Sequence, residues 1–213
     1  MKRKLLPSLL ALALLLSGCA TSKIYAKDKV DGAYFAVPNG WKKIEQTALA
    51  KREAESKVAG AADRLSLVTW QEAYYQKGKL EPADIYSLKA PASPLVYARV
   101  RNLSAGEAQS VSYNSLRDII LPLTDWITKS TDPSKFNLLD DYEVADKHVH
   151  GIRSIYTFKG ADGVNQTIDQ TAVVSDDRTK IFVLLVRAKS EEFTSNKKVL
   201  TKIADSFTIN GGK

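Results

Sequence analysis

The chain has 213 residues and a formal net charge of +7, from 31 lysines and arginines against 24 aspartates and glutamates. One cysteine and two histidines exclude an internal disulfide and a cysteine-rich zinc site. The 44% hydrophobic content, with 26% charged residues, is typical of a globular chain rather than a disordered one, and the length favours one domain.

The first residues have the pattern of an export signal. Basic residues 2–4 precede an apolar run, Leu5–Leu16, that as a helix would be roughly 18 Å long, too short for the ~30 Å core of a bilayer. The sequence Leu16-Ser17-Gly18-Cys19 resembles the lipobox of bacterial lipoproteins, and its cysteine is the only one in the chain. The resemblance implies that residues 1–18 are a signal peptide cleaved after Gly18, and that a diacylglyceryl group is attached to the Cys19 sulfur.

A lipid on Cys19 would place the protein on a bacterial membrane, facing outside the cytoplasm, in the outer leaflet of the plasma membrane or in the periplasmic or outer-membrane compartment. Two acyl chains make such an attachment stable. Removal of residues 1–18 leaves 28 basic and 24 acidic residues, a net charge of +4, with no lysine or arginine stripe. The compartment and the modest charge both argue against nucleic acid as a partner.

Residues 19–31 are expected to form a lipidated tether between the membrane and the folded domain. Its lysines are either solvated or attracted to anionic headgroups, and they are Lys23, Lys27 and Lys29.

The first half of the mature chain predicts strands around one helix. Strand composition at 33–37 is followed by a tight turn at Pro38-Asn39-Gly40. The Ala-, Glu- and Lys-rich run 45–59 favours an exposed helix with a thin apolar face. Strands are expected at 65–70 and 95–103, separated by a long loop or insertion at 76–94 that holds Gly78 and three prolines.

The clearest helical pattern covers residues 112–129. Its apolar residues recur at spacings of three and four, and they are Leu116, Ile119, Ile120, Leu123 and Ile127. Pro122 lacks a backbone donor and clashes with the preceding turn, which predicts a kink near 118–122 or two helices that meet there.

The last third of the chain predicts a three-stranded antiparallel meander followed by a helix. Strands 151–159, 164–175 and 181–186 are separated by two turn sequences. Six consecutive apolar residues from Ile181 leave no polar face, so this strand is expected to be central and covered on both sides.

Two helices are expected to provide the covering layers. The C-terminal helix, with Thr194 or Ser195 as N-cap, is one layer and helix 112–129 is the other. The apolar face of the C-terminal helix holds Val199, Leu200, Ile203 and Phe207.

These elements predict an α+β fold, a three-layer α/β/α sandwich with a mainly antiparallel central sheet, in one domain over 32–213. The pattern resembles the PsbP-like fold of extrinsic photosystem subunits and of many bacterial secreted lipoproteins. The resemblance depends on Phe35-Ala-Val-Pro-Asn-Gly-Trp41, on the late hairpins and on the closing segment Ile203-Ala-Asp-Ser-Phe207. It implies an accessory or binding role without a shared catalytic site.

The two histidines are the one candidate for a metal site. On a strand, His148 and His150 would share a face, and a carboxylate from Asp140, Asp141 or Asp146 would complete three ligands. The favoured alternative is a hydrogen-bonded, half-exposed pair at the polar end of a strand.

The acidic pairs at 140–141 and 176–177 are interpreted as structural or solvated rather than functional. Asp176-Asp177-Arg178 is expected to form a hairpin turn, and Asp140-Asp141 is expected to be solvated rather than to bind a cation.

Nothing in the sequence predicts catalytic, cofactor-binding or metal-binding residues. The chain has no Gly-x-Ser-x-Gly elbow and no phosphate-binding glycine loop, and lipidation would consume Cys19. The tyrosines around the 76–94 loop are a candidate partner or ligand surface, or they pack that loop against the sheet; they are Tyr74, Tyr75, Tyr86 and Tyr97.

Three functional hypotheses remain open. The first is a non-enzymatic, membrane-anchored lipoprotein that binds another envelope component. The second is a carrier of a small apolar or lipid-like ligand, with a cavity lined by Leu116, Ile120 and Leu123. The third is a metal-dependent enzyme that uses His148 and His150.

Overall fold

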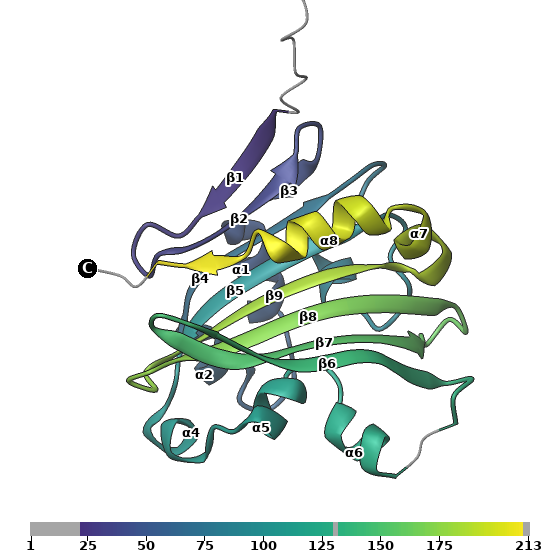
Figure 1. The fold of residues 1–213 in the computed structure, drawn as a ribbon. Helices are drawn as coiled ribbons and strands as arrows, with labels where there is room; N and C mark the ends of the chain where they lie inside the picture. Colours follow the sequence, from purple (N-terminus) through teal and green to yellow (C-terminus); the bar gives the residue numbers. More distant parts are fainter. Residues whose placement is uncertain (1–21, 130–131, 211–213) are drawn as a thin grey trace, which may run out of the picture.

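The computed structural model describes residues 22–129 and 132–210 (Figure 1). The strands are β1 (Lys23–Lys27), β2 (Ala33–Pro38), β3 (Lys42–Ile44), β4 (Val68–Tyr75), β5 (Leu95–Asn102), β6 (Phe136–Asp146), β7 (Val149–Lys159), β8 (Asn165–Ser175), β9 (Lys180–Lys189) and β10 (Thr208–Ile209). The helices are α1 (Gln46–Ala54), α2 (Ala61–Ser66), α3 (Pro82–Ile85), α4 (Ala105–Ser110), α5 (Tyr113–Arg117), α6 (Leu123–Thr128), α7 (Ser190–Ser195) and α8 (Lys197–Asp205).

A seven-stranded antiparallel sheet runs through the centre of the molecule in the order β3-β4-β5-β9-β8-β7-β6. A second sheet has the order β1-β2-β10. The small sheet and α8 cover one face of the large sheet, whereas α4, α5 and α6 lie on the opposite face (Figure 1). The predicted α+β sandwich with covered faces is confirmed, with a small sheet as part of one layer.

Strand β9 is the central element that the apolar run at Ile181 predicts. Because side chains alternate along a strand, Phe182, Leu184 and Val186 enter the core beneath α8, whereas Ile181, Val183 and Leu185 enter the core beneath α1, α5 and α6. Each of these six side chains is at most 6% exposed. The strand therefore requires an apolar cover on both faces.

The 112–129 segment is two helices that meet at Pro122, one of the two predicted outcomes. Pro122 is the N-cap of α6, where a missing backbone donor costs nothing. Only part of the predicted apolar stripe is buried, because the break rotates the two halves. Leu116 and Leu123 are buried, whereas Ile120 and Ile127 are each 37% exposed.

Several predicted boundaries are wrong for identifiable reasons. The 45–59 helix ends at Ala54, since only Leu49 of α1 is buried and residues 55–60 are all exposed, so no burial stabilises further turns. The strand expected at 65–70 starts only at Val68, because the left-handed Gly60 (φ 72°) precedes a short helix, α2.

The final helical region is also divided differently from the prediction. Asn196, not Thr194 or Ser195, is the N-cap of α8, because the preceding residues already form α7. Leu200 and Ile203 of α8 are buried against the sheet as predicted, and Val199 and Phe207 pack at its edge.

The tether predicted over 19–31 is wrong for its central part. Lys23–Lys27 forms β1, which pairs antiparallel with β2, and Ala26 is 2% exposed. The alternation of Lys23, Tyr25 and Lys27 with Ile24 and Ala26 fits a strand with one buried face. Among residues 22–129 and 132–210, the buried residues of both hydrophobic cores lie between Ala26 and Ile209, so the chain from Ala20 onward retains every core residue that the structure describes.

Across residues 22–129 and 132–210, no helix has both the length and the apolar character needed to cross a membrane.

A buried ion pair connects α8 to the large sheet. Arg153 of β7 donates two hydrogen bonds of 2.7 Å to Asp169 of β8, and a third of 2.7 Å to Asp205 at the end of α8. The Asp169 side chain is 1% exposed. A buried charge is tolerated only with such complete pairing, so this cluster fixes the position of α8.

Substitution Asp169→Asn is expected to lower the free energy of unfolding by about 3 kcal/mol, because it leaves the Arg153 charge buried without its bidentate partner. Urea unfolding of the chain from Ala20 onward measures this change. The control Asp125→Asn removes an acid from the exposed pair with Lys129 and is expected to cost about 0.5 kcal/mol or less. Equal losses in the two variants would contradict the role given to Asp169.

Candidate functional site

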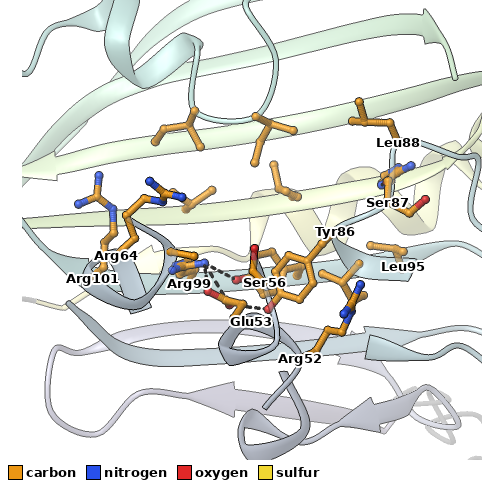
Figure 2. Close-up of a pocket in the computed structure, with 18 of the residues that line it drawn as sticks. Arg52, Glu53, Ser56, Arg64, Tyr86, Ser87, Leu88, Leu95, Arg99 and Arg101 are labelled. Atoms are coloured by element: carbon orange, nitrogen blue, oxygen red, sulfur yellow. Dashed lines mark hydrogen bonds and ion pairs between the residues drawn. The ribbon is translucent and has the colours of Figure 1, made fainter. Parts of the chain in front are cut away.

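A pocket of about 650 Å³ lies on the face of the large sheet that α1 to α6 cover. Its floor is formed by β5 and β9, and its walls by α1, the α1–α2 loop, the segment after α3 and the loop between α5 and α6 (Figure 2). The volume lies within the range of small-molecule sites, which is roughly 300–1,000 Å³.

The floor of the pocket is apolar because of the alternation of the strands. Odd-numbered residues of β5 and β9 face this side, so Leu95, Val183 and Leu185 reach the pocket with Ile181 and with Ile168 of β8. Ile85, Leu88, Ile119 and Ile120 extend the apolar lining onto the walls. The β9 side of the floor is therefore hydrophobic, whereas β5 also contributes Tyr97 and Arg99.

A polar network forms the wall beside α1. Glu53 accepts a 2.5 Å hydrogen bond from the Tyr86 hydroxyl and forms a 3.0 Å ion pair with Arg99 of β5 (Figure 2). The Tyr97 hydroxyl donates to Gln71 Oε1 at 2.7 Å. Burial raises the pKa of Tyr97 to about 12 and also raises the pKa of Tyr86, so both phenols stay neutral at physiological pH. The network holds α1 and the Tyr86 segment against the sheet.

Arg187 anchors the opposite wall. Its guanidinium donates to Gln166 Oε1 at 2.6 Å, to the Ser87 carbonyl at 2.7 Å and to the Lys89 carbonyl. The residue is 5% exposed, and in the described part of the chain no carboxylate forms an ion pair with it. Burial lowers its pKa to about 10, which leaves it cationic at neutral pH. Its hydrogen bonds fix the loop that carries Tyr86 and Leu88.

Basic residues outnumber acidic ones in the lining. The cations are Arg52, Lys57, Arg64, Arg99, Arg101 and Arg187, and the acids are Glu53 and Glu55. Arg101 forms a two-bond ion pair with Glu107, at 2.8 and 3.1 Å, which holds the pKa of that carboxyl at about 2. The pocket thus combines an apolar floor with a basic rim.

The histidines are not arranged as the metal hypothesis requires. His148 lies in the turn between β6 and β7 rather than on a strand, so strand alternation does not align it with His150. His150 Nδ1 is 3.3 Å from Asp176 Oδ1, and its ring contacts Tyr113. Within residues 22–129 and 132–210, no three metal-ligating side chains cluster.

The predicted acidic motifs divide into one confirmed and one corrected interpretation. Residues 176–178 form the β8–β9 turn, with Arg178 in the left-handed region at φ 55°. Asp141 is not simply solvated, because it accepts hydrogen bonds from Arg117 at 2.9 Å and Ser154 at 2.5 Å. Asp140, its neighbour in β6, is exposed.

The four tyrosines around the 76–94 loop are divided between the pocket and the two cores. Tyr86 and Tyr97 line the pocket, with ring centroids 6.0 Å apart. Tyr75 is packed in the core on that side, and Tyr74 faces the other core. Cys19, with the lipobox and the predicted signal peptide, lies outside the described residues.

Sequence reasoning missed the arginines of the floor and rim. Their signal was present, since Leu95, Tyr97, Arg99 and Arg101 occupy alternate positions of one predicted strand and so share a face. Arg64 gave no such signal, because the strand expected at 65–70 hid the start of the helix α2 that positions it. Lys57 was expected in the 45–59 helix but lies in the loop between α1 and α2.

By sequence, neither a protein-family model nor a curated protein matches this chain. By structure, it is similar to the cyanobacterial PsbP (CyanoP) of Synechocystis sp. PCC 6803, with a TM-score of 0.52 and 12% identity over 93% of this chain and 98% of that one. The chain has a PsbP-like fold. The fold implied by the resemblance in the Phe35–Trp41 and Ile203–Phe207 motifs and in the late hairpins is therefore confirmed.

Two further solved structures align with the chain over most of their length. The Ran-binding protein Mog1p of Saccharomyces cerevisiae has a TM-score of 0.44 and 11% identity, over 89% of this chain and 96% of that one. LpqN of Mycobacterium tuberculosis, described as involved in cell envelope biogenesis, has a TM-score of 0.46 and 15% identity, over 91% of this chain and 87% of that one.

Substitution Arg187→Gln is expected to release the loop at 87–89, because glutamine is too short to reach the two carbonyls that the guanidinium holds. Hydrogen exchange should become at least about tenfold faster for amides near this loop, with a loss of about 2 kcal/mol in unfolding free energy. Arg52→Gln, at an exposed part of the same rim, serves as control and should change neither quantity. Unchanged exchange in Arg187→Gln would refute the anchoring role.

Proposed function

We propose that this chain is a membrane-anchored, non-enzymatic binding protein of the bacterial cell envelope, and that it holds a small ligand with an apolar part in the pocket over β5 and β9. The observation that carries this proposal is the apolar floor, formed by the Leu95, Val183 and Leu185 side chains, inside a site of about 650 Å³. A surface of this kind gains free energy when an apolar ligand displaces water from it.

The pocket favours the carrier hypothesis over an adaptor with a solid core. A carrier requires a cavity beside the 112–129 segment, and Ile119 and Ile120 of that segment line the pocket. Leu116 and Leu123, also expected to line it, are packed in the core instead. The cavity that the carrier hypothesis requires is therefore present, but part of its lining differs from the expected one.

A protein-binding role has one feature in its favour. Strand β6 is at the edge of the large sheet and exposes Leu139 (53%) and Tyr142 (39%). However, its exposed Asp140 and Glu143 and the irregularity between Leu138 and Asp140 are devices that discourage pairing at an edge strand. The pocket is thus the better supported binding site.

The polar groups of the pocket support binding rather than catalysis. Glu53 accepts a hydrogen bond from Tyr86 and is ion-paired with Arg99, and a carboxylate so paired is a poor base. The raised pKa values of Tyr86 and Tyr97 disfavour the phenolate forms that would serve as nucleophiles.

The anchor of the proposed function is the lipid on Cys19. Only residues 20–22 separate Cys19 from β1, a reach of at most about 14 Å. The small sheet would therefore lie next to the bilayer. The outward face of β1 carries Lys23, Tyr25 and Lys27, side chains that suit the headgroup region.

Binding is expected to follow alkyl chain length. Displacement of the fluorescent probe N-phenyl-1-naphthylamine from the chain starting at Ala20 should improve from octanol to dodecanol by up to about fourfold per methylene, because each buried methylene contributes about 0.8 kcal/mol. Val183→Trp places an indole on the floor, and Ala61→Trp places one at the rim. Both variants are expected to weaken binding at least about tenfold.

The matched control is Leu139→Trp, which adds the same indole at an exposed position of β6. It should bind the probe as the unmodified chain does. Circular dichroism establishes that the variants are folded. Folded Val183→Trp and Ala61→Trp proteins that both bind normally would refute the pocket as the site.

Lipidation of Cys19 is tested on the protein purified from membranes of its own cells. Intact-mass analysis is expected to give a chain that begins at acylated Cys19, and Cys19→Ala should accumulate unprocessed or in the soluble fraction. A soluble protein with a free Cys19 thiol would contradict the anchor.

A further inference from the structure

Two of the lining arginines lie together at one end of the pocket. Arg64 and Arg101 lie close together there, whereas Ser87, Leu88 and Leu95 lie at the other end (Figure 2). The strand register agrees with this arrangement. Arg101 is paired with Ile181 and Leu95 with Arg187, so Arg101 and Leu95 lie at opposite ends of the floor. Six residue steps from Leu95 to Arg101 correspond to about 20 Å. The pocket is therefore long, with Arg64 and Arg101 at one end and Leu88 and Leu95 at the other.

The arginine at the opposite end is already satisfied. Arg187 is committed to Gln166 and to the carbonyls of Ser87 and Lys89, which it holds in place. Arg99, midway along the floor, is paired with Glu53. Arg52, on the Leu95 side of the pocket in Figure 2, forms a 3.4 Å ion pair with Glu55. These three cations have partners within the fold, and the apolar contacts are left to the β9 side chains of the floor.

Two lining cations, Arg64 at the Arg101 end and Lys57 of the α1–α2 loop, are incompletely satisfied. Arg64 donates to the Ala59 carbonyl at 3.2 Å, one of the five N–H groups of its guanidinium. Neither Arg64 nor Lys57 has an acidic partner within 4.0 Å among the residues that the structure describes. Arg101 is neutralised by Glu107, so the uncompensated charge belongs to Arg64 and Lys57. A ligand with an acidic group would complete this end.

We infer that the ligand of this pocket is an anionic amphipath, with one acyl chain on the β5–β9 floor and a carboxylate or phosphate head beside Arg64 and Arg101. This inference rests on the proposed function and specifies its ligand class. The guanidinium fork of Arg64 matches the oxygens of either head, and Lys57 adds positive charge to the pocket lining. A neutral lipid would leave Arg64 and Lys57 without an acidic partner.

The test compares ligands that share one alkyl chain. Dodecanoate, dodecyl phosphate and dodecanol each displace N-phenyl-1-naphthylamine from the chain starting at Ala20. At low ionic strength, both anions are expected to bind at least about tenfold more tightly than dodecanol, and this preference should shrink in about 0.5 M salt. Inorganic phosphate alone should displace no probe, because it lacks the chain.

Arg64→Gln is the decisive variant. It is expected to weaken dodecanoate and dodecyl phosphate about tenfold while leaving dodecanol unchanged, because only the head contacts the guanidinium. Arg64 is exposed on a short helix, so its substitution leaves both cores intact. Lys198→Gln removes the same charge from α8, which packs against the opposite face of the sheet, and should change no affinity.

The outcomes separate this inference from the function on which it depends. Equal binding of all three ligands would overturn the anionic head and leave the pocket as an apolar site. An anion preference that survives in Arg64→Gln would overturn the placement of the head. Displacement by inorganic phosphate alone would identify a site for free anions instead. Failure of every ligand to displace the probe would overturn the proposed function as well.

Discussion

Strand β9 is the constraint on which the rest of the structure depends. Its side chains from Ile181 to Val186 are apolar on both faces, so each face must be covered for the sheet to exist in water. On one face the cover is α7, α8 and the small sheet, which pack with Leu200 and Ile203 at the centre. The Arg153–Asp169 ion pair fixes α8 by binding Asp205. The C-terminal third of the chain thus supplies both the central strand and part of one cover.

The second cover is built from short helices and loops, and its incompleteness produces the pocket. Leu49, Leu116 and Leu123 fill most of that face, but over β5 and the start of β9 only walls remain. Those walls are held by specific polar contacts, Glu53 with Tyr86 on one side and Arg187 with the Ser87 and Lys89 carbonyls on the other. Hydrogen bonds position the walls where hydrophobic packing is insufficient, and this arrangement leaves an apolar floor accessible. A lipid on Cys19 would hold such a site near the source of its ligands.

Sequence patterns predict the sheet of this protein better than its site. The apolar run at Ile181 and the turn residues of the late hairpins depend on local chemistry, so β7, β8 and β9 are predictable. The 65–70 region was mistaken for one strand because Leu65, Leu67 and Val68 alternate in part, whereas the left-handed Gly60 starts a helix first. The pocket depends on Arg64, Arg99 and Tyr86, which are brought together by pairing of distant segments. No local pattern encodes that proximity, although alternation along β5 places Tyr97, Arg99 and Arg101 on one face.

A crystal structure of the chain from Ala20 onward, grown with dodecanoate, tests the central claim most directly. The account predicts electron density for the alkyl chain along the floor between Leu95 and Ile181, with Val183 and Leu185 beneath it. It also predicts the carboxylate beside Arg64. Dodecanoate bound elsewhere, or a pocket closed by the Tyr86 and Ile120 side chains with no ligand inside, would contradict the account.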